Sequence, residues 1–481
     1  MHRTRILPAL LAGALLAAVA GCAATGSQPS ATTPQAGKGP VQSAANPHMG
    51  TSFSLLAFTA TGSMGNPYNG QLLFNNAVSK AFPGALASNN RSCASCHVSG
   101  DAFGLAAKTA NAKPASDPLI AALLADGDPD VDFSTPEGQK LETIMLDQLR
   151  KVGFIRIVLP NPTYDPSMGP SGDNPLFIKT FRSVPTVFNS ALGPFESFNT
   201  AAGGTFKAFT MWDGREISLE HQAGSATIGH AQTVLANNPT GDTRAFLDGK
   251  KVTADIAAFE KKMLSMPQSL ATIGWEMPVR NTDLDGTIYE GAPKFTLATV
   301  KDKFFKTVNL TTEAQKRGMR VFTGTPQKPA CIVCHNMPET LAGGTNLFED
   351  ARISEENTHP RLQAPDAYTR GLLEEFGFKF LGDGTVQQLP VQTLRLKKAD
   401  GSYETVHTPD PGLAGQTGKF EDLHEFKVSQ LRGIKNANRY FHDNHERELS
   451  GVVHHYMQQF PELFPFTPSE ENDLLEFLKA L

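Results

Sequence analysis

Apolar residues recur at helical spacing in two stretches of the 481-residue chain, one near its middle and one at its end. These positions are Ile256, Phe259 and Met263, and then Leu474, Leu475, Phe477, Leu478 and Leu481. Such spacing is typical of a helix with one buried face. The second stretch opens on Thr467-Pro468-Ser469-Glu470, a capping box with proline at the first helical position. We therefore expect a helix in each stretch.

A weak internal repeat links the two halves of the chain. Gly70-Gln-Leu-Leu-Phe74 and Gly318-Met-Arg-Val-Phe322 each place a glycine and a phenylalanine four residues apart, on one face of a helix. Each precedes a cysteine cluster. Strand signals are sparse, and the Pro/Gly-rich stretch 159–175 is typical of a surface loop. The pattern predicts an all-α chain of two domains with a boundary near residues 265–300.

The N-terminus has the form of an export signal. Two arginines precede an apolar run over residues 6–20, which is too short to span a bilayer. The run ends in Val19-Ala20-Gly21-Cys22, which resembles the bacterial lipoprotein cleavage motif. We expect a signal peptide over 1–22, a lipid anchor on Cys22, a flexible tether over 23–50 and a periplasmic location. Ordinary cleavage near Ala24 is the alternative, and it also exports the chain.

Charge adds little to this interpretation. Lys and Arg number 43 and Asp and Glu number 48, a balance that favours neither a nucleic-acid surface nor an anionic membrane surface.

Four of the five cysteines lie in two Cys-x-x-Cys-His clusters, Cys93 to His97 and Cys331 to His335. A thioredoxin-like pair would need a βαβ context, and a zinc site would need two further ligands for each cluster. Covalent c-type haem fits better, because two thiols add to the porphyrin vinyl groups and the adjacent histidine ligates iron. We therefore expect two covalent haems, attached at Cys93 and Cys96 and at Cys331 and Cys334, with His97 and His335 as iron ligands.

The sequence resembles the bacterial dihaem cytochrome c peroxidases and their MauG relatives over about residues 65–481. The similarity lies in the two clusters with their preceding helices, in the closing helix, and in four motifs. These are FRSVPTVFN at 181–189, MWDGREISLEHQA at 211–223, DIAAFEKKML at 255–264 and FKVSQLRGIKNANRYFHDN at 426–444. The resemblance implies two cytochrome c-like domains, 51–268 with the peroxidatic haem and 269–481 with the electron-transfer haem.

The resemblance also implies the state of the first iron. Many family members close it with a histidine eight residues before the Asn of PTVFN, a position that is Phe181 here. No histidine occurs between His97 and His221. We therefore expect an open iron that needs no reductive activation, with Met145 or Met168 as the alternative ligand.

At the second haem, the family's sixth ligand lies fourteen residues after the histidine that is His442 here. This count gives Tyr456, a tyrosine as in MauG. A shift of one residue selects Met457, and His454 and His455 could also ligate iron. The alternative role for Tyr456 is packing within a helix.

Further roles follow from the resemblance alone. Trp212 occupies the position of the electron bridge between the haems, although an isolated tryptophan is more often a core residue. Asn189 corresponds to the side-chain ligand of an inter-domain calcium ion. The matching backbone ligands are Ala437 and Arg439, where the family usually has Thr and Pro. The resemblance thus implies one calcium ion, and these two differences weaken that expectation.

Cleavage of peroxide needs a group that accepts a proton from one oxygen and returns it to the other. The family supplies a glutamine, here Gln222, and a glutamate ten residues later, here Gln232. An amide cannot carry that proton. His230 could replace it, since imidazole titrates near neutral pH; otherwise His230 is a loop histidine.

These observations predict a lipid-anchored periplasmic oxidoreductase that reduces hydrogen peroxide at the first haem with electrons from the second. The electron source would be a small cytochrome c or cupredoxin, or an oxidisable protein substrate. An electron carrier with two six-coordinate haems and an oxygen-using dihaem oxygenase are the alternatives.

Overall fold

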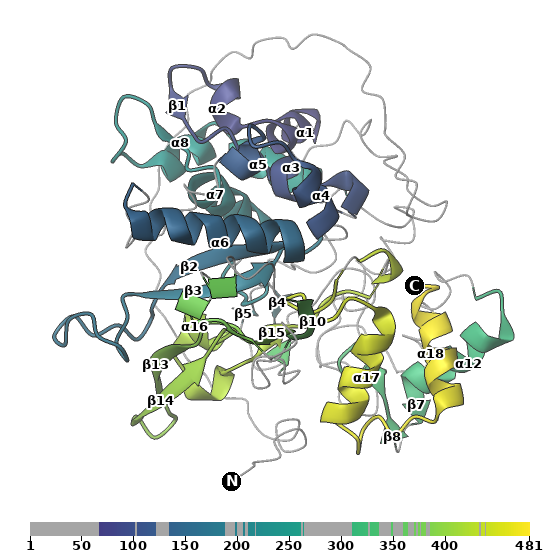
Figure 1. Ribbon diagram of the computed structural model, residues 1–481. Coiled ribbons are helices and arrows are strands. Elements are labelled where there is room, and N and C mark those ends of the chain that lie inside the picture. Colours follow the sequence, from purple (N-terminus) through teal and green to yellow (C-terminus); the bar gives the residue numbers. More distant parts are fainter. Residues whose placement is uncertain are drawn as a thin grey trace.

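The computed structural model describes most of the chain from residue 67 onward (Figure 1). The described residues are 67–101, 103–121, 134–187, 198–199, 205–206, 210–216, 218–260, 263, 310–325, 328–335, 348–349, 359–363, 370–371, 374–375, 377–380, 385–431, 434–437 and 439–481. The expected signal peptide, the tether and the domain boundary near 268 lie outside them and stay predictions. No helix in these ranges is long and apolar enough to cross a membrane.

Helices form the larger part of the regular structure. The α-helices are α1 (Pro67–Asn75), α2 (Val78–Ala81), α3 (Cys93–Cys96), α4 (Ala107–Ala112), α5 (Pro118–Ala121), α6 (Pro136–Val152), α7 (Leu219–Gly229), α8 (Thr243–Gly249), α9 (Val252–Glu260), α12 (Glu313–Thr323), α16 (Ala414–Thr417), α17 (Leu449–Gln459) and α18 (Pro468–Leu478). Short 3-10 helices are η1 (Ser99–Asp101), η4 (Cys331–Val333), η5 (Phe420–Asp422) and η6 (Ile434–Asn436).

Strands form small antiparallel sheets around these helices. Their bounds are β1 (Leu86–Ala87), β2 (Phe154–Pro160), β3 (Phe177–Ser183), β4 (Phe198–Asn199), β5 (Thr205–Phe206), β6 (Val234–Leu235), β7 (Gly324–Thr325), β8 (Lys328–Pro329), β9 (Phe348–Glu349), β10 (His359–Gln363), β11 (Lys379–Phe380), β12 (Thr385–Gln388), β13 (Gln392–Lys397), β14 (Tyr403–Thr408) and β15 (Phe426–Lys427). The pairs are β1–β6, β2–β3, β4–β5, β7–β8, β9–β15 and β13–β14, and β10, β12 and β11 form a three-stranded sheet.

The all-α prediction is therefore right only in part. The two cysteine clusters sit on helical cores, but β2 and β3 pair over seven residues each, from Phe154 opposite Ser183 to Pro160 opposite Phe177. Residues 154–160 read FIRIVLP and are rich in β-branched side chains, which favour a strand.

The predicted repeat of helix and aromatic residue is confirmed. Helix α1 crosses α9 and helix α12 crosses α18, with Phe74 and Phe259 ring centroids 5.1 Å apart and Phe322 and Phe477 centroids 5.2 Å apart. At each crossing a glycine lets the helices touch: a Cβ on Gly70 or Gly318 would lie 1.9 Å from the Asp255 or Asp473 carbonyl oxygen respectively. The glycines are thus required by close approach of the two backbones.

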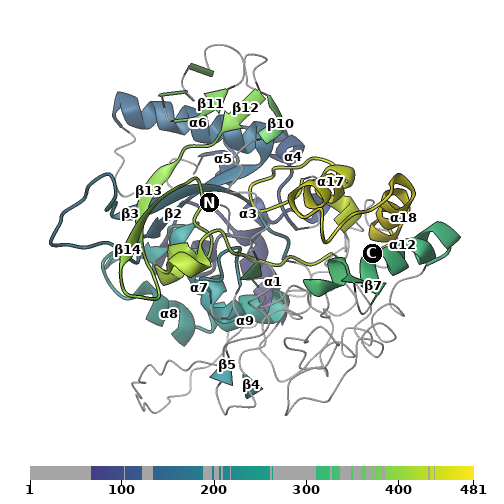
Figure 2. The same ribbon diagram turned by 90° about the horizontal axis from the view of Figure 1, so that it is seen from below.

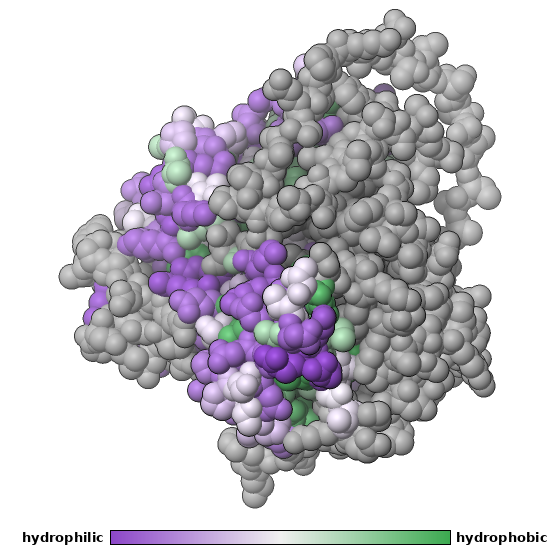
Figure 3. Space-filling model, turned by 90° about the vertical axis from the view of Figure 1, so that its right-hand side faces the viewer, coloured by the Kyte–Doolittle hydropathy of each residue, from purple (hydrophilic) through white to green (hydrophobic). Residues whose placement is uncertain are grey.

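Segments of the second half pack on the first half. The hairpin β13–β14 lies beneath β2–β3 (Figures 1 and 2). Leu394, Leu396 and Val406 of the hairpin share a buried cluster with Leu159 and Ile178. Helices α12, α17 and α18 form a separate group on the other side, and the face seen in Figure 3 is mainly hydrophilic among its coloured residues, with small hydrophobic spots.

Candidate functional site

The first cysteine cluster is a single helical turn followed by a histidine. Helix α3 begins after Ser92, whose backbone N–H donates to Ser95 Oγ at 3.1 Å. The His97 backbone N–H donates to the Cys93 carbonyl at 2.8 Å, which closes the turn. Among the described cysteines no disulfide is present. Cys93 and Cys96 therefore lie one turn apart with His97 directly after them.

The His97 imidazole is held in the tautomer that an iron ligand needs. Its Nδ1 lies 2.9 Å from the Phe103 carbonyl oxygen, which can only accept, so Nδ1 carries the proton and Nε2 keeps its lone pair. Burial lowers the pKa of His97 to about 4, so the ring is neutral near pH 7. The Phe74 ring lies 6.3 Å from it.

A cavity of about 360 Å³ lies next to this turn. Cys93, Cys96 and His97 all line it, so the three residues of the cluster border one space. This is the arrangement that a covalently attached haem requires. Its size is within the range of small-molecule and cofactor sites.

Burial disfavours ionisation of the first thiol in each cluster. Burial, and then the nearby Glu260 carboxylate, raise the pKa of Cys93, and burial raises the pKa of Cys331 to about 12. Thiol redox chemistry needs a thiolate, so these raised pKa values disfavour a redox pair. In addition, no group of three or more metal-ligating side chains gathers among the described residues. As far as the structure describes the chain, the clusters thus lack the further ligands that a zinc site would need.

The structure separates the predicted proton-carrying residues. Gln222 of α7 and His230 just after it both line the cavity. Gln232 is not among the lining residues, and its backbone is in the left-handed region with φ 46°. The His230 carbonyl accepts from Asn89 Nδ2 at 2.9 Å, which fixes the loop. Of the two candidates, His230 is the one at the cavity.

Sequence reasoning missed one carboxyl group in this cavity. Glu260, at the end of α9, is 2% exposed and lines the cavity. It belongs to the motif DIAAFEKKML, where an acidic residue directly follows the buried Phe259. That break in an apolar face is the signal that could have identified it.

Trp212 lines the cavity and is anchored by both halves of the chain. Its indole Nε1–H donates to the Ser183 carbonyl at 3.1 Å, and its own carbonyl accepts from the Lys427 backbone N–H at 2.9 Å. The Ser183 N–H in turn donates to the His442 carbonyl at 2.7 Å. Trp212 is therefore fixed at the junction of the two halves, where a bridge between them would have to lie.

A buried ion network lies behind Trp212. Arg182 donates to Asp410 at 2.6 and 2.7 Å and to Asp213 at 2.5 Å, and Arg215 donates to Asp213 at 3.0 Å. Burial alone would raise the pKa of Asp410, but the Arg182 guanidinium outweighs it and holds the pKa at about 2. The same guanidinium outweighs burial at Asp213 and lowers its pKa. Two positive and two negative charges balance, which is what a buried cluster requires.

The second cysteine cluster repeats the first. The His335 N–H donates to the Cys331 carbonyl at 3.0 Å, and the Phe322 ring lies 6.4 Å from His335. Cys331 packs against the same apolar core as Phe322. Cys334 follows directly after η4. Because 336–347 lie outside the described residues, the surroundings of His335 are only partly defined.

Helix α17 carries the candidate ligands for this second site. Met457 packs against the apolar core that includes Cys331. Tyr456 belongs to an aromatic group, with its ring 6.0 Å from Phe441, 5.7 Å from Phe464 and 6.2 Å from Phe460. The two histidines differ in setting, since His455 is buried whereas His454 is exposed and pairs with Glu471 at 3.2 Å. Tyr456 and Met457 both remain predicted ligands.

Neither of the two methionines considered as ligands of the first iron is among the residues that line the cavity, and neither is Phe181, which replaces the family's closing histidine. Phe181 packs between Phe154 and Phe378, with ring centroids 6.1 and 5.6 Å away. Met145 is buried in a neighbouring core, and Met168 is 48% exposed. The alternative of Met145 or Met168 as the ligand thus gains no support. 

Two of the three expected calcium ligands are described. Ala437 and Arg439 line the cavity, whereas Asn189 lies outside the described residues. The calcium site therefore stays a prediction.

Comparison with solved structures gives matches that span most of each chain. One is a MauG-like protein associated with microbial copper homeostasis, at 17% identity and TM-score 0.39, covering 90% of this chain and 93% of that one. Another is the diheme peroxidase BthA from Burkholderia thailandensis, at 14% identity and TM-score 0.35, covering 88% and 87%. No protein-family model and no curated protein matches the chain.

Proposed function

We propose that the chain is a dihaem c-type oxidoreductase of the cytochrome c peroxidase and MauG type, which reduces hydrogen peroxide. One observation carries this proposal: both Cys-x-x-Cys-His clusters sit on the same glycine-phenylalanine helix crossing, and the first opens into a cavity with the His97 Nε2 lone pair available.

The attachment residues follow from this geometry. Cys93 and Cys96 would hold one haem with His97 as ligand, and Cys331 and Cys334 would hold the other with His335. When bound, these haems supply iron for peroxide binding at the first site and one-electron transfer at the second. The Phe103 carbonyl keeps the His97 ring oriented and raises its basicity as a ligand.

The chain's own residues would supply the proton chemistry. Reduction of one hydrogen peroxide to two waters consumes two protons and two electrons. His230 would accept a proton from one peroxide oxygen and return it to the other, while the Gln222 amide donates a hydrogen bond to the substrate. Both side chains line the cavity, which supports these roles.

Electrons would pass between the sites by way of Trp212. Its position at the junction of the halves, held by Ser183 and Lys427, supports that role. The donor would be a small cytochrome c or cupredoxin, or a protein substrate oxidised at the surface, met in the periplasm by a chain anchored through Cys22.

Mass spectrometry of protein matured in a haem-attaching periplasm tests the proposal. We expect two haem masses on the wild-type chain and one on the Cys93→Ser/Cys96→Ser variant. The bare-chain mass would refute the proposal. A resting EPR spectrum then separates the alternatives, because an open first iron gives a high-spin signal and an electron carrier gives two low-spin signals. Peroxide turnover without oxygen would exclude the oxygenase.

A further inference from the structure

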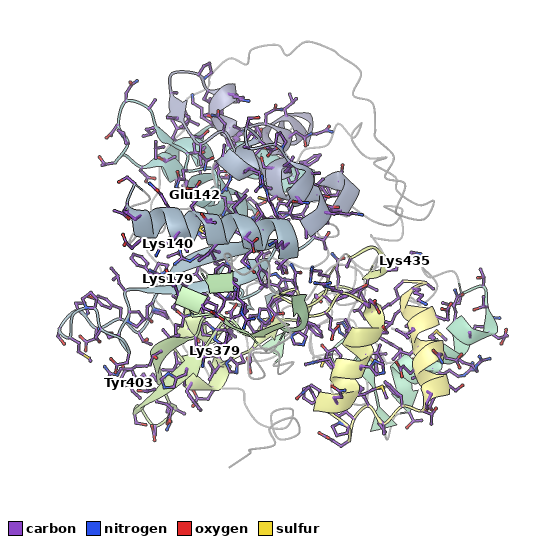
Figure 4. All side chains as sticks on the ribbon, in the orientation of Figure 1. Lys140, Glu142, Lys179, Lys379, Tyr403 and Lys435 are labelled. Carbon is purple, nitrogen blue, oxygen red and sulfur yellow. The ribbon has the colours of Figure 1, made fainter. Side chains whose placement is uncertain are left out.

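Arg439 is a cation of the first cavity that comes from the second half of the chain. It lies between η6 and α17, in the segment that Lys435 marks in Figure 4. Arg439 is one of the residues that line the cavity, and its Nη2 donates to the Lys151 carbonyl at the end of α6 at 3.2 Å. Its other outer nitrogen, Nη1, is buried and has no hydrogen-bond partner among the described residues.

The guanidinium groups at the cavity differ in their partners: two pair with a carboxylate, whereas Arg91 and Arg439 each donate to a backbone carbonyl and each keep one buried nitrogen without an acceptor within the ranges that the structure describes. Arg182 and Arg215 pair with Asp213, and Arg91 donates to the Leu119 carbonyl at 2.9 Å. No carboxylate in the described part of the chain pairs with Arg439.

The buried guanidinium of Arg439 would be stabilised by an anion. A buried donor without an acceptor costs its full desolvation penalty, and more when the group is charged. Burial, and then the neighbouring Arg447, lower the pKa of Arg439 to about 10. An anion at Nη1 would supply the missing acceptor and would offset the unfavourable burial of the positive charge.

We propose that Arg439 binds a carboxylate inside the first cavity, and that this carboxylate is a propionate of the haem attached at Cys93 and Cys96. The inference rests on the haem loading proposed above. A c-type haem carries two propionates, and a guanidinium is the side chain best matched to a carboxylate, with two parallel N–H donors. A haem attached to the first half would then be held by a residue of the second half, next to Lys151.

The test compares Arg439→Gln in two backgrounds, the haem-loaded chain and the Cys93→Ser/Cys96→Ser chain that cannot attach the first haem. In the loaded chain we expect the melting temperature to fall by about 3–6 °C, because a hydrogen bond to a charged group is lost. In the Ser/Ser chain we expect no fall, or a small rise, because the variant removes an uncompensated charge. The exposed Arg320→Gln is the matched control and should have little effect in either background.

A second readout does not depend on thermal unfolding. The Arg439→Gln variant should lower the reduction potential of the first haem, since an unpaired propionate favours the ferric state. Arg439→Lys should restore part of that potential because it keeps the charge. This measurement also covers the case in which the Ser/Ser chain fails to fold.

Three outcomes would overturn the inference. An equal loss of stability in both backgrounds would make Arg439 a structural residue only, and an unchanged potential would exclude a propionate contact. Stabilisation of the loaded wild type by added acetate, absent in Arg439→Gln, would assign the site to an external carboxylate. Mass spectrometry on the same samples separates the two proposals: absence of haem refutes the proposed function, whereas two haems with any of these outcomes refute the Arg439 assignment alone.

Discussion

The helix crossing behind each cysteine cluster should be sensitive to a single methyl group. In Gly318→Ala the new Cβ would meet the Asp473 carbonyl oxygen at 1.9 Å and the Phe477 Cβ at 2.7 Å, whereas ordinary contact begins near 3.4 Å. Helices α12 and α18 must therefore separate by about 1.5 Å at this point. That separation loosens the Phe322–Phe477 ring pair and the core around Cys331.

Overpacking of this kind costs about 1–3 kcal/mol, and the better helix propensity of alanine returns about 0.5–1 kcal/mol. We expect a net loss of about 1–2 kcal/mol for Gly318→Ala and a similar loss for Gly70→Ala, whose Cβ would also lie 1.9 Å from a carbonyl oxygen. Thermal and urea unfolding followed by circular dichroism measures the loss, with haem content read from the Soret band. Gly229→Ala in α7 is the control, since nothing lies within 4 Å of its Cβ. If Gly318→Ala were as stable as that control, the close-approach argument would be wrong.

Three other expectations concern the sites themselves. Tyr456→Phe should change the low-spin EPR signal and leave the high-spin signal alone; if only Met457→Leu changes it, the ligand is Met457. His230→Ala should lower peroxide turnover by about 10²–10⁴-fold, the usual effect of a lost acid-base group, and Gln232→Glu should have little effect because Gln232 is not at the cavity. Because the pKa of Asp410 is held at about 2, below its unfolded value, its contribution to stability is complete above about pH 4 and is lost as the pH falls toward 2. Acid titration of Asp410→Asn should show a smaller loss over that window, and an identical curve would contradict the assignment.

The repeat could be predicted because its signal is local. A glycine and a phenylalanine four residues apart lie on one face of a helix whatever the rest of the chain does. The capping box at Thr467 is likewise present, with the Glu470 N–H donating to Thr467 Oγ1 at 3.3 Å. The cysteine spacing fixes one helical turn for the same reason.

The strands could not be predicted in this way. Some depend on packing against residues far away in the sequence, and others are too short to show an alternating apolar pattern. The stability of β13–β14 depends on packing against Leu159 and Ile178, more than 200 residues earlier. Likewise, the sequence around Arg182 gives no sign of its partners, because Asp213 and Asp410 lie in distant parts of the chain. Only the folded backbone brings these groups together.

At the candidate site, residues that belong to a recognisable motif could be predicted from the sequence. Residues whose role depends on where the fold places them could not. Cys93, Cys96 and His97 follow from their spacing, and Gln222 was located through the resemblance. The tautomer of His97 depends on the Phe103 carbonyl, which any residue at 103 could supply, so no sequence pattern encodes it. The same holds for Glu260, whose place in the cavity depends on the crossing of α9 with α1.

The first cavity is not a product of the first half alone. Lys427, Arg439 and Phe441 form part of its lining, and the same segment packs Leu431 and Tyr440 into the core that holds Cys331. The backbone carbonyl of Trp212 accepts a hydrogen bond from the Lys427 N–H of the same segment. The segment between β15 and α17 therefore contributes to the surroundings of both clusters, through the cavity beside the first and the apolar core beside the second.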